Sequence, residues 1–297
     1  MSLSGHLIIS AAPYKLWYQE RHVDSQKVVS IPLDGKYAAE TFFTNARYGE
    51  LCLSYKTDLE AVYSAKNLAA NFYTVLSVQN DQMVEFMRSD KPIIFPFITP
   101  SRDKIVFIGP TNLEKHEYHL YQYRMTDQTI SRVSALPVVC WSKPIFSPDG
   151  RIIFSAVNEY HKDRNGKGNI LWAAATIVEI GANGAETKLA SGIFPTWLEE
   201  GRSFFFFDNI ARQLKLYNPT KQERITVIKD KVRMMNHPAL SPDKKFLAFY
   251  GIIVGPEAHF GGFLQVLSVN GWVNRLIELP ENPVYHKHGV GIINWSK

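Results

Sequence analysis

The stretch Pro144-Ile-Phe-Ser-Pro-Asp-Gly-Arg-Ile-Ile-Phe-Ser-Ala156 decides how this chain folds. Two apolar segments flank its centre, Ser147-Pro-Asp-Gly150. Proline presets φ in such a centre, and Asp or Gly tolerates the tight bend that follows. The stretch therefore predicts two antiparallel strands joined by a short turn.

The same unit recurs along the chain. Further copies begin at Pro96, Pro195 and Pro238, and a weaker one begins at Cys52. After the turn and its second strand, each copy is expected to continue with a third, alternating strand and a fourth, more polar strand. Four strands in about 40 to 50 residues match the length of one β-propeller blade. The clearest of these predicted strands are the second strands 151–157 and 246–253, the third strands 119–124 and 213–217, and the fourth strands 187–190 and 275–279.

The sixth copy is divided between the two ends of the chain. Ile293–Lys297 is similar to the first half of the unit, and Leu3–Ser10 is similar to the second half. Strand 290–295 is therefore expected to pair with strand 7–11 in one blade, because a propeller left open at either end would expose a strand edge. The sequence predicts an all-β, six-bladed β-propeller with four-stranded antiparallel blades. N- and C-terminal strands that share one blade would close it, and residues 1–297 would form a single domain. Five or seven blades stay as alternatives, because the region 30–47 is hard to partition.

Two of these units carry a family resemblance. Ser147-Pro-Asp-Gly-Arg-Ile-Ile-Phe154 and Ser241-Pro-Asp-Lys-Lys-Phe-Leu-Ala-Phe249 resemble the repeats of TolB-type six-bladed propellers, which are WD40-like (PD40) repeats. The resemblance extends over the whole chain at the level of blades, and two copies depart from it, at Glu199-Glu-Gly201 and at Ser54-Tyr55. It implies a propeller with protein partners. It transfers no catalytic residue, because the motif is structural.

Composition narrows the class of protein. The chain has 297 residues, with 33 Lys and Arg against 28 Asp and Glu, and a net charge of +5. Its 45% hydrophobic content excludes an intrinsically disordered chain. The basic residues are scattered rather than concentrated, so no nucleic-acid partner is expected. No apolar run is long enough to predict a membrane span. The protein is also expected to be a monomer.

The cysteines and the N-terminal residues bear on the compartment. Cys52 and Cys140 sit in apolar runs and are expected to be small buried hydrophobes. Residues 1–10 contain no intact secretory signal. We therefore expect a periplasmic protein if a leader has been removed, and a cytoplasmic protein otherwise.

Blade topology assigns the loops to two faces. The turns at Asp149-Gly150 and Asp243-Lys244 lie on one face, which we call the turn face. The loops between second and third strands, among them 158–169 and 208–212, lie on the other, the loop face, with the segments that lead into the next blade. Loops held by a rigid frame often carry function. The residues predicted to bind a ligand at the axial mouth of the loop face are Arg47, Trp141, His161, Arg164, Arg212, His237, His259, His286 and His288.

The histidines admit three interpretations. They are solvated residues of surface loops, or they bind a ligand through hydrogen bonds, or His237, His286 and His288 hold a divalent metal. Some sugar-acid lyases that resemble this class of propeller use histidine-bound metal. The short pair His286-x-His288 lacks the Glu or Cys that would complete a recognisable metal site, so no cofactor is expected.

Other patterns are assigned to packing. The chain has no Gly-x-Ser-x-Gly elbow and no Gly-rich phosphate loop. The run Phe204–Phe207 is expected to be a strand buried on both faces. Trp197 and Trp295 match the aromatic position before the turn and are expected to pack. Residues 173–180 are interpreted as a strand because β-branched residues end the segment.

The predicted function is that of a non-enzymatic binding module. An axial mouth lined by basic, histidine and aromatic side chains suits an acidic or polar partner, either a protein or peptide or an acidic oligosaccharide. The alternative is a metal-dependent lyase or hydrolase that acts on acidic sugars through His237, His286, His288 and a loop histidine. A third interpretation is an interaction scaffold that uses the rim or the turn face.

Overall fold

The regular structure of this protein consists of β-strands. The computed structural model describes residues 6–10, 28–32, 40–43, 48–56, 60–67, 69–79, 82–113, 117–157, 160–162, 168–170, 175–208, 210–211, 213–218, 223–228, 232–234, 238–253, 263–269, 274–277 and 293–296, some of them by their backbone only. All regular elements in these ranges are strands, and every strand pair with an assigned register is antiparallel. The all-β class predicted from the sequence is confirmed. No helix that could cross a membrane occurs in the part of the chain that is described.

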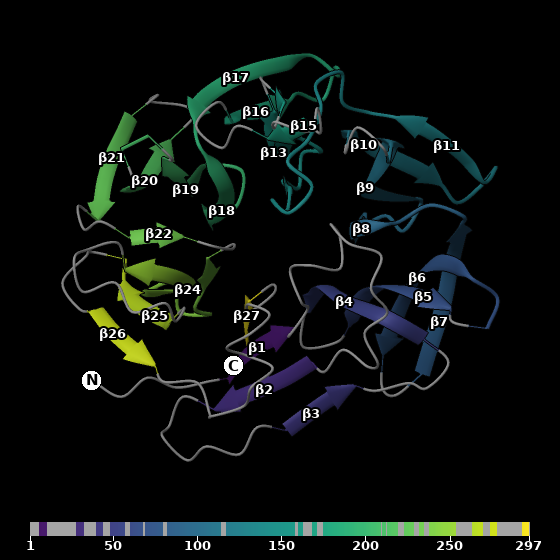
Figure 1. The fold of residues 1–297 in the computed structure, drawn as a ribbon, viewed down its shortest axis with the longest axis horizontal. Helices are drawn as coiled ribbons and strands as arrows, with labels where there is room; N and C mark the ends of the chain where they lie inside the picture. Colours follow the sequence, from purple (N-terminus) through teal and green to yellow (C-terminus); the bar gives the residue numbers. More distant parts are fainter. Residues whose placement is uncertain are drawn as a thin grey trace. The chain divides into compact units, whose positions relative to one another are not determined.

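The chain divides into two compact units, and the second comprises residues 98–233. Three four-stranded sheets make up this unit, and the first strand of one sheet begins just before it (Figure 1). In sheet order they contain β11 (Thr129–Arg132), β10 (Glu117–Arg124), β9 (Lys104–Asn112) and β8 (Ile94–Ile98); β12 (Ile145–Phe146), β13 (Ile152–Val157), β16 (Ala175–Ile180) and β17 (Glu186–Ser191); and β18 (Ile193–Glu199), β19 (Ser203–Asp208), β20 (Gln213–Asn218) and β21 (Glu223–Ile228).

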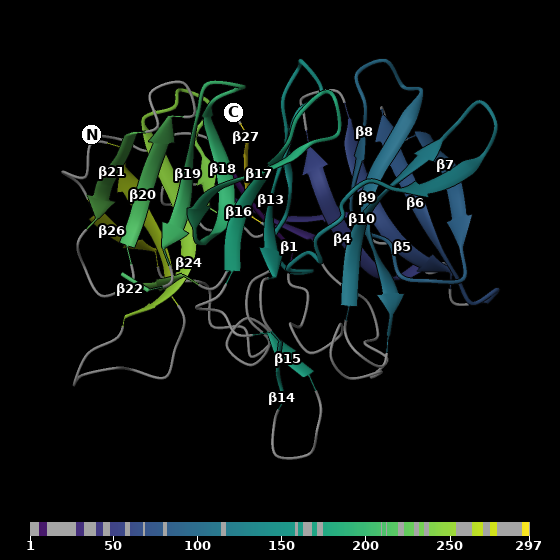
Figure 2. The same ribbon diagram turned by 90° about the horizontal axis from the view of Figure 1, so that it is seen from above.

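A separate ribbon lies between β13 and β16 in the sequence. β14 (Tyr160–Lys162) pairs with β15 (Gly168–Ile170), and neither pairs with another described strand (Figure 2). His161 lies opposite Asn169 in this ribbon. The loop expected at 158–169 therefore contains a two-stranded hairpin of its own.

The first unit comprises residues 1–97 and 234–297. It holds three more sheets, one of which has a first strand that begins just before residue 234. In sheet order they contain β27 (Ile293–Ser296), β1 (His6–Ser10), β2 (Val28–Pro32) and β3 (Glu40–Phe43); β4 (Tyr48–Lys56), β5 (Ala61–Asn67), β6 (Phe72–Gln79) and β7 (Gln82–Ser89); and β22 (Val232–Met234), β24 (Phe246–Ile253), β25 (Phe263–Ser268) and β26 (Asn274–Ile277), with β23 (Ala239–Leu240) also paired to β24.

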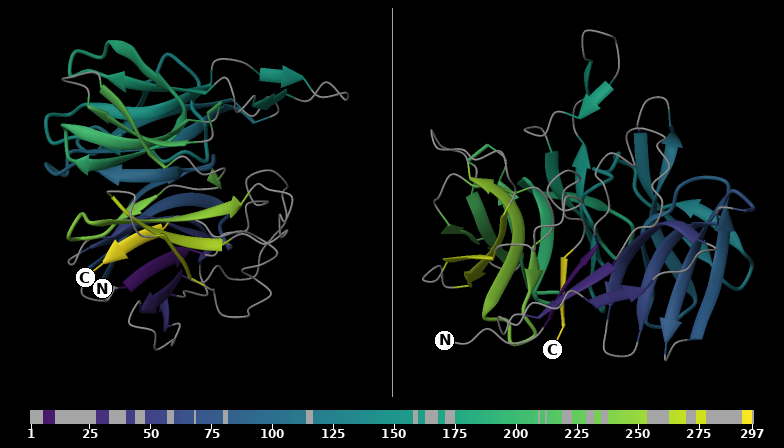
Figure 3. Two further views of the ribbon diagram at one scale, coloured as in Figure 1. Left: turned by 90° about the vertical axis from the view of Figure 1, so that its left-hand side faces the viewer. Right: turned by 60° about the horizontal axis from the view of Figure 1, so that its bottom comes forward.

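The last strand of the chain pairs with the first. β27 and β1 run antiparallel, with Leu7 opposite Trp295 and His6 opposite Ser296 (Figure 3). On its other side β1 pairs with β2. The two ends of the chain therefore contribute to one four-stranded sheet, through the strand pairing that the sequence predicted.

A serine or threonine hydroxyl closes the repeated turn. Ser241 Oγ donates to Asp243 Oδ1 over 2.6 Å and accepts from the Phe246 N–H over 2.9 Å. Ser147 bonds in the same way to Asp149 and the Arg151 N–H, and Thr99 to Asp103 and the Lys104 N–H. The hydroxyl thus ties the turn carboxylate to the start of the following strand. This bonding explains why the repeat combines a hydroxyl with an acid, which follows Ser147 and Ser241 by two residues and Thr99 by four.

One residue in each turn adopts a left-handed backbone. Gly150 has a φ of 84° and Lys244 a φ of 59°, and their N–H groups donate to the carbonyls of Ser147 and Ser241. Glycine enters this region without steric cost, whereas a residue with a Cβ does so uncommonly. The Asp-Gly and Asp-Lys turns therefore share one backbone geometry. Gly150 adopts this geometry at a lower steric cost than Lys244 does.

The strand before each turn is irregular at one position. Phe95 and Phe194, each followed by proline, have φ angles of 49° and 59°, which are unusual for bulky residues. β18 shifts register against β19 at this point, and β4 shifts against β5 between Gly49 and Cys52. Proline has no N–H to donate and restricts the residue before it. β18 and β4 therefore each contain a bulge where a regular strand was expected.

In two sheets the strand before the turn is short, and a second piece of chain pairs with the same neighbouring strand. The pieces that directly precede the turns are the two-residue strands β12 and β23. β22 and β23 both pair with β24, and Val138 forms a bridge with Ala156 beside β12 and β13. Each of these sheets is thus completed by two short pieces of chain on one neighbouring strand.

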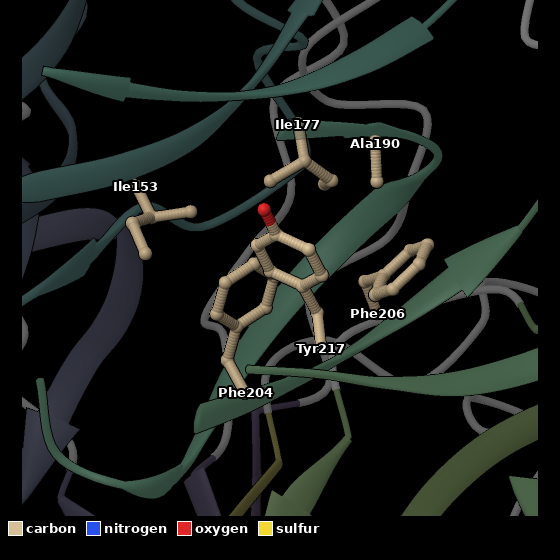
Figure 4. Close-up of a cluster of buried hydrophobic side chains, with 6 residues drawn as sticks. All are labelled: Ile153, Ile177, Ala190, Phe204, Phe206 and Tyr217. Atoms are coloured by element: carbon tan, nitrogen blue, oxygen red, sulfur yellow. The ribbon is translucent and has the colours of Figure 1, made fainter. Parts of the chain in front are cut away.

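An aromatic core joins two sheets of the second unit. Phe204 and Phe206 of β19 and Tyr217 of β20 pack in one buried cluster with Ile153, Ile177 and Ala190 of the neighbouring sheet (Figure 4). The rings of Phe204 and Tyr217 meet edge to face with centroids 5.2 Å apart. Phe205 and Phe207, which alternate with them along β19, are also buried. The prediction that 204–207 is a strand buried on both faces is confirmed.

Hydrogen bonds join the same two sheets near the turn face. Trp197 Nε1 donates to the Phe146 carbonyl over 2.9 Å, which links β18 to β12. The Arg151 guanidinium donates to the Gly201 carbonyl over 2.7 Å and forms an ion pair with Glu179. The expected packing of Trp197 is therefore found, whereas the side chain of Trp295 lies outside the described residues.

Two further predictions concern Cys140 and the segment 173–180. Cys140 is buried, and burial raises the pKa of its thiol to about 12. A thiol with this pKa stays protonated and unreactive at neutral pH, as expected for a small buried hydrophobe. The side chain of Cys52 lies outside the described residues. β16 covers residues 175–180, which confirms the strand over that range, and residues 173 and 174 lie outside the described part of the chain.

Truncating Phe204 tests the aromatic core. Removal of a buried phenylalanine side chain costs about 3–5 kcal/mol, because transfer energy is lost and a cavity stays behind. We expect Phe204→Ala to lower the free energy of unfolding in urea by that amount, measured by tryptophan fluorescence. The control is Ile130→Ala on β11, where the residue is 51% exposed and the loss should be below about 0.5 kcal/mol. Equal losses in the two variants would contradict the burial of Phe204.

The turn carboxylates predict a pH dependence of stability. A hydrogen bond from Ser147 lowers the pKa of Asp149, and one from Ser241 lowers that of Asp243. A lowered folded-state pKa gives stability that is present above the unfolded pKa, about 3.9, and is lost as the pH falls through the folded value. The double variant Asp149→Asn, Asp243→Asn should therefore be less stable than the parent near neutral pH.

The same difference in stability should shrink in acid, where the parent carboxylates are protonated. Urea unfolding across the acidic range measures it. Asp90→Asn, which removes one exposed carboxylate outside the turns, controls for the loss of a surface charge. A difference between parent and double variant that is the same at neutral pH and in strong acid would contradict the role given to these hydrogen bonds.

Candidate functional site

Two of the predicted ligand-binding residues lie in the described part of the chain. Trp141 is half-buried in the turn before β12, and His161 belongs to the ribbon strand β14. The others lie outside the described residues: Arg47, Arg164, Arg212, His237, His259, His286 and His288. The convergence of these side chains at an axial mouth stays a prediction.

Buried hydroxyls hold the segment that carries Trp141. Ser142 Oγ lies 2.6 Å from Ser155 Oγ and accepts from the Phe194 N–H over 3.2 Å. These bonds connect the turn before β12 to β13 and to β18. Trp141 is therefore presented from a fixed backbone, because its neighbour in the sequence is bonded to both sheets. His161 belongs to a different segment, the β14–β15 ribbon.

The described residues contain no metal-binding arrangement. No group of three or more His, Cys, Asp or Glu side chains in this part of the chain is placed to hold a metal ion. The ligands that the sequence suggested, His237, His286 and His288, lie outside it. A metal site at those residues stays a prediction.

A pocket opens between two sheets of the second unit. Its volume is about 200 Å³. β19 leaves the turn face at Ser203 and ends at Asp208, so the pocket lies at the loop-face end of the strand. Two of its lining residues, Phe206 and Ala190, also belong to the aromatic core. The lining consists of Ala190, Ser191, Phe206, Asp208, Ile210, Ala211 and Lys215.

An ion pair forms the polar wall of this pocket. Lys215 Nζ lies 2.5 Å from Asp208 Oδ2, and both side chains are largely buried. Asp208 Oδ1 accepts from the N–H groups of Ile210 and Ala211 over 3.0 and 2.9 Å. Burial acts to raise the pKa of Asp208, but the hydrogen bonds from Lys215 and from the backbone outweigh it and lower the pKa. Asp208 is therefore an ionised group whose two oxygens are both bonded.

Strand register creates this wall. Phe204, Phe206 and Asp208 alternate along β19 and so point to one side of the sheet. Lys215 of β20 lies directly opposite Phe206. The aromatic face of β19 therefore ends in the carboxylate of Asp208. Lys215, on the neighbouring strand β20 opposite Phe206, neutralises it.

Blade topology placed 208–212 on the loop face, and Arg212, the residue predicted to bind a ligand there, lies outside the described residues. Asp208 and Lys215 were not among the predicted binding residues. The alternation of Phe204, Phe206 and Asp208 was a signal that could have identified the acid. The partner could not be found in this way, because the register between β19 and β20 and the position of Ala190 depend on the packing of strands and sheets.

Sequence comparison identifies no relative: no family model matches this sequence, and no curated protein sequence matches it. Solved structures do match it by fold. TolB from Acinetobacter baumannii superposes with a TM-score of 0.65 at 12% identity, over 99% of this chain and 67% of the TolB chain. A chain in the crystal structure of a nidogen–laminin complex superposes with a TM-score of 0.60 at 11% identity, over 98% of this chain and 97% of that chain.

Identities this low relate the folds and not the functions. The structural matches extend over nearly the whole chain, and they agree with the resemblance carried by the two Ser-Pro-Asp units. The chain therefore has the fold of a TolB-like β-propeller.

Proposed function

We propose that this protein is a non-enzymatic binding module that takes an acidic or polar partner, a peptide or an oligosaccharide, at its loop face. The observation that carries the proposal is the pocket at the loop-face end of β19, where an apolar floor meets the Lys215 ammonium group. Ligand sites commonly combine an apolar lining with a few placed polar groups. Nothing in this arrangement requires the pocket to perform chemistry.

The architecture proposed for the module is a single six-bladed propeller over residues 1–297. Six sheets of four or five strands in the described residues support that number of blades. The pairing of β27 with β1 supports closure by one blade built from both ends of the chain. A ring of this kind would place the loops of all blades on one face, where they could act on one partner.

Charge favours an acidic partner. The chain has a net charge of +5, and complementary charge increases the rate of encounter and the selectivity between partners. The predicted residues Arg47, Arg164, Arg212, His237, His259, His286 and His288 would add positive or titratable groups to the same face, beside Trp141 and His161. The nidogen–laminin structure is that of a protein complex, which favours a protein or peptide among the partners considered.

Calorimetric titration with two acidic probes tests this function. Poly-L-glutamate represents an acidic peptide, and oligogalacturonate represents an acidic oligosaccharide. We expect at least one to bind, and Arg212→Glu to weaken it about tenfold or more, because a repulsive charge replaces an attractive one. The matched control is Lys188→Glu, which makes the same change of charge at an exposed position of β17 and should alter the affinity less than about twofold.

The same samples test the enzymatic alternative. Oligogalacturonate is incubated with the protein and Mn²⁺, and the ultraviolet absorbance of an unsaturated product is followed. Turnover that is lost on chelation and in His237→Ala would replace the binding module by a metal-dependent lyase. Absence of binding to both probes would also overturn the proposal.

A further inference from the structure

The pocket beside β19 forms where large apolar side chains no longer fill the core between two sheets. Phe204 and Phe206 fill the interface with the neighbouring sheet, and Ala190 faces them with a single methyl group (Figure 4). The next residue of β19 on this side is Asp208, which does not extend the apolar packing. Ser191, the last residue of β17, is exposed at the margin of the pocket. The interface therefore ends in an open space with an apolar floor and a polar wall.

The polar wall offers hydrogen-bond donors and no unused acid. Asp208 already accepts two backbone N–H groups and the Lys215 ammonium group. A lysine ammonium group carries three N–H donors, and Asp208 is the one partner of Lys215 among the described residues. Further N–H groups of Lys215 therefore remain for an occupant. An occupant with strong acceptor oxygens fits these donors.

The floor and rim select for apolar surface on the occupant. A cavity of about 150 Å³ is large enough to hold benzene, and this pocket measures about 200 Å³. Phe206 and Ala190 form the floor, both buried, and Ile210 stands at the rim with 70% of its surface exposed. Sugar hydroxyls placed against this floor would lack hydrogen-bond partners, which costs free energy. A branched aliphatic group is the better match.

We propose that this pocket binds the C-terminal residue of a peptide that ends in an aliphatic amino acid. The aliphatic side chain lies on Phe206 and Ala190, and the terminal carboxylate accepts hydrogen bonds from Lys215 Nζ. Capture of a chain terminus by its carboxylate is an established mode of peptide recognition. The inference rests on the proposed binding function and deepens it, because it selects a peptide over an oligosaccharide and names the end of the peptide that is recognised.

The test follows the Ile210 methyl group by nuclear magnetic resonance in protein labelled at its isoleucine methyl groups. The probe is the peptide acetyl-Ala-Ala-Leu with a free carboxylate, and the control ligand is the same peptide as its C-terminal amide. We expect a saturable shift of the Ile210 signal with the acid. The amide should bind about tenfold or more weakly, because it cannot form the charge-assisted hydrogen bond.

Two variants probe the two halves of the pocket. Lys215→Met keeps an unbranched side chain without the ammonium group and should weaken the acid about tenfold or more. Ala190→Leu fills the floor and should abolish the shift. Lys188→Met removes a lysine from an exposed position of the same strand as Ala190 and should leave the affinity within about twofold. Circular dichroism and thermal unfolding verify that each variant is folded.

Three results would overturn this inference: no shift of Ile210, equal binding of acid and amide, or an unchanged affinity in a folded Lys215→Met variant. The proposed function fails by a different result, which is that neither poly-L-glutamate nor oligogalacturonate binds. Binding of those polymers without binding of the tripeptide would reject the pocket assignment and leave the binding module in place.

Discussion

A strand that is apolar on both faces must be covered on both faces, and this constraint organises the protein. β19 carries four consecutive phenylalanines, and all are buried. One isolated four-stranded sheet cannot cover its own two faces, so each sheet of this kind needs neighbours. At roughly 25 cal/mol per Å² of apolar surface removed from water, the covering of aromatic rings is a large part of the driving force. The neighbouring sheet supplies part of this cover through Ile153, Ile177 and Ala190.

Polar groups are tolerated at the margins of this packing because each has a partner. Serine hydroxyls bind the turn carboxylates and the start of the next strand. Arg151 and Trp197 donate to carbonyls of a neighbouring sheet. Phe95 and Phe194 adopt unusual φ angles in the strands that precede two of the turns. A proline follows each of them, and β18 shifts register against β19 beside Phe194, where proline has no N–H to donate to the ladder.

The pocket is a consequence of the same stacking. Where facing side chains are large, the interface is filled; where Ala190 faces the end of β19, it opens. The ion pair of Asp208 and Lys215 then lies at the end of an aromatic row rather than in open solvent. A row of alternating side chains that changes from phenylalanine to aspartate thus turns a packing interface into a concave surface with defined donors.

Much of the fold follows from local chemistry in the sequence. The Ser-Pro-Asp turns, the alternation of the strands and the apolar run Phe204–Phe207 each act over a few residues, so they can be read without knowledge of the partners. They predicted the all-β class, the positions of the clear strands and the pairing of β27 with β1. The candidate site was harder to predict from the sequence. Arg212, which was selected for its residue type, lies outside the described residues, and the Asp208 and Lys215 that line the pocket were not selected.

The sequence by itself determined the repeated strand–turn–strand unit, because turn geometry and two-residue periodicity are properties of short segments. The tertiary structure alone decided where the strands bulge, that Lys215 stands opposite Phe206, and that Ala190 of another sheet leaves room beside them. Those features depend on the register between strands and on the contact of two sheets. The spacing of residues along the chain does not encode either of these.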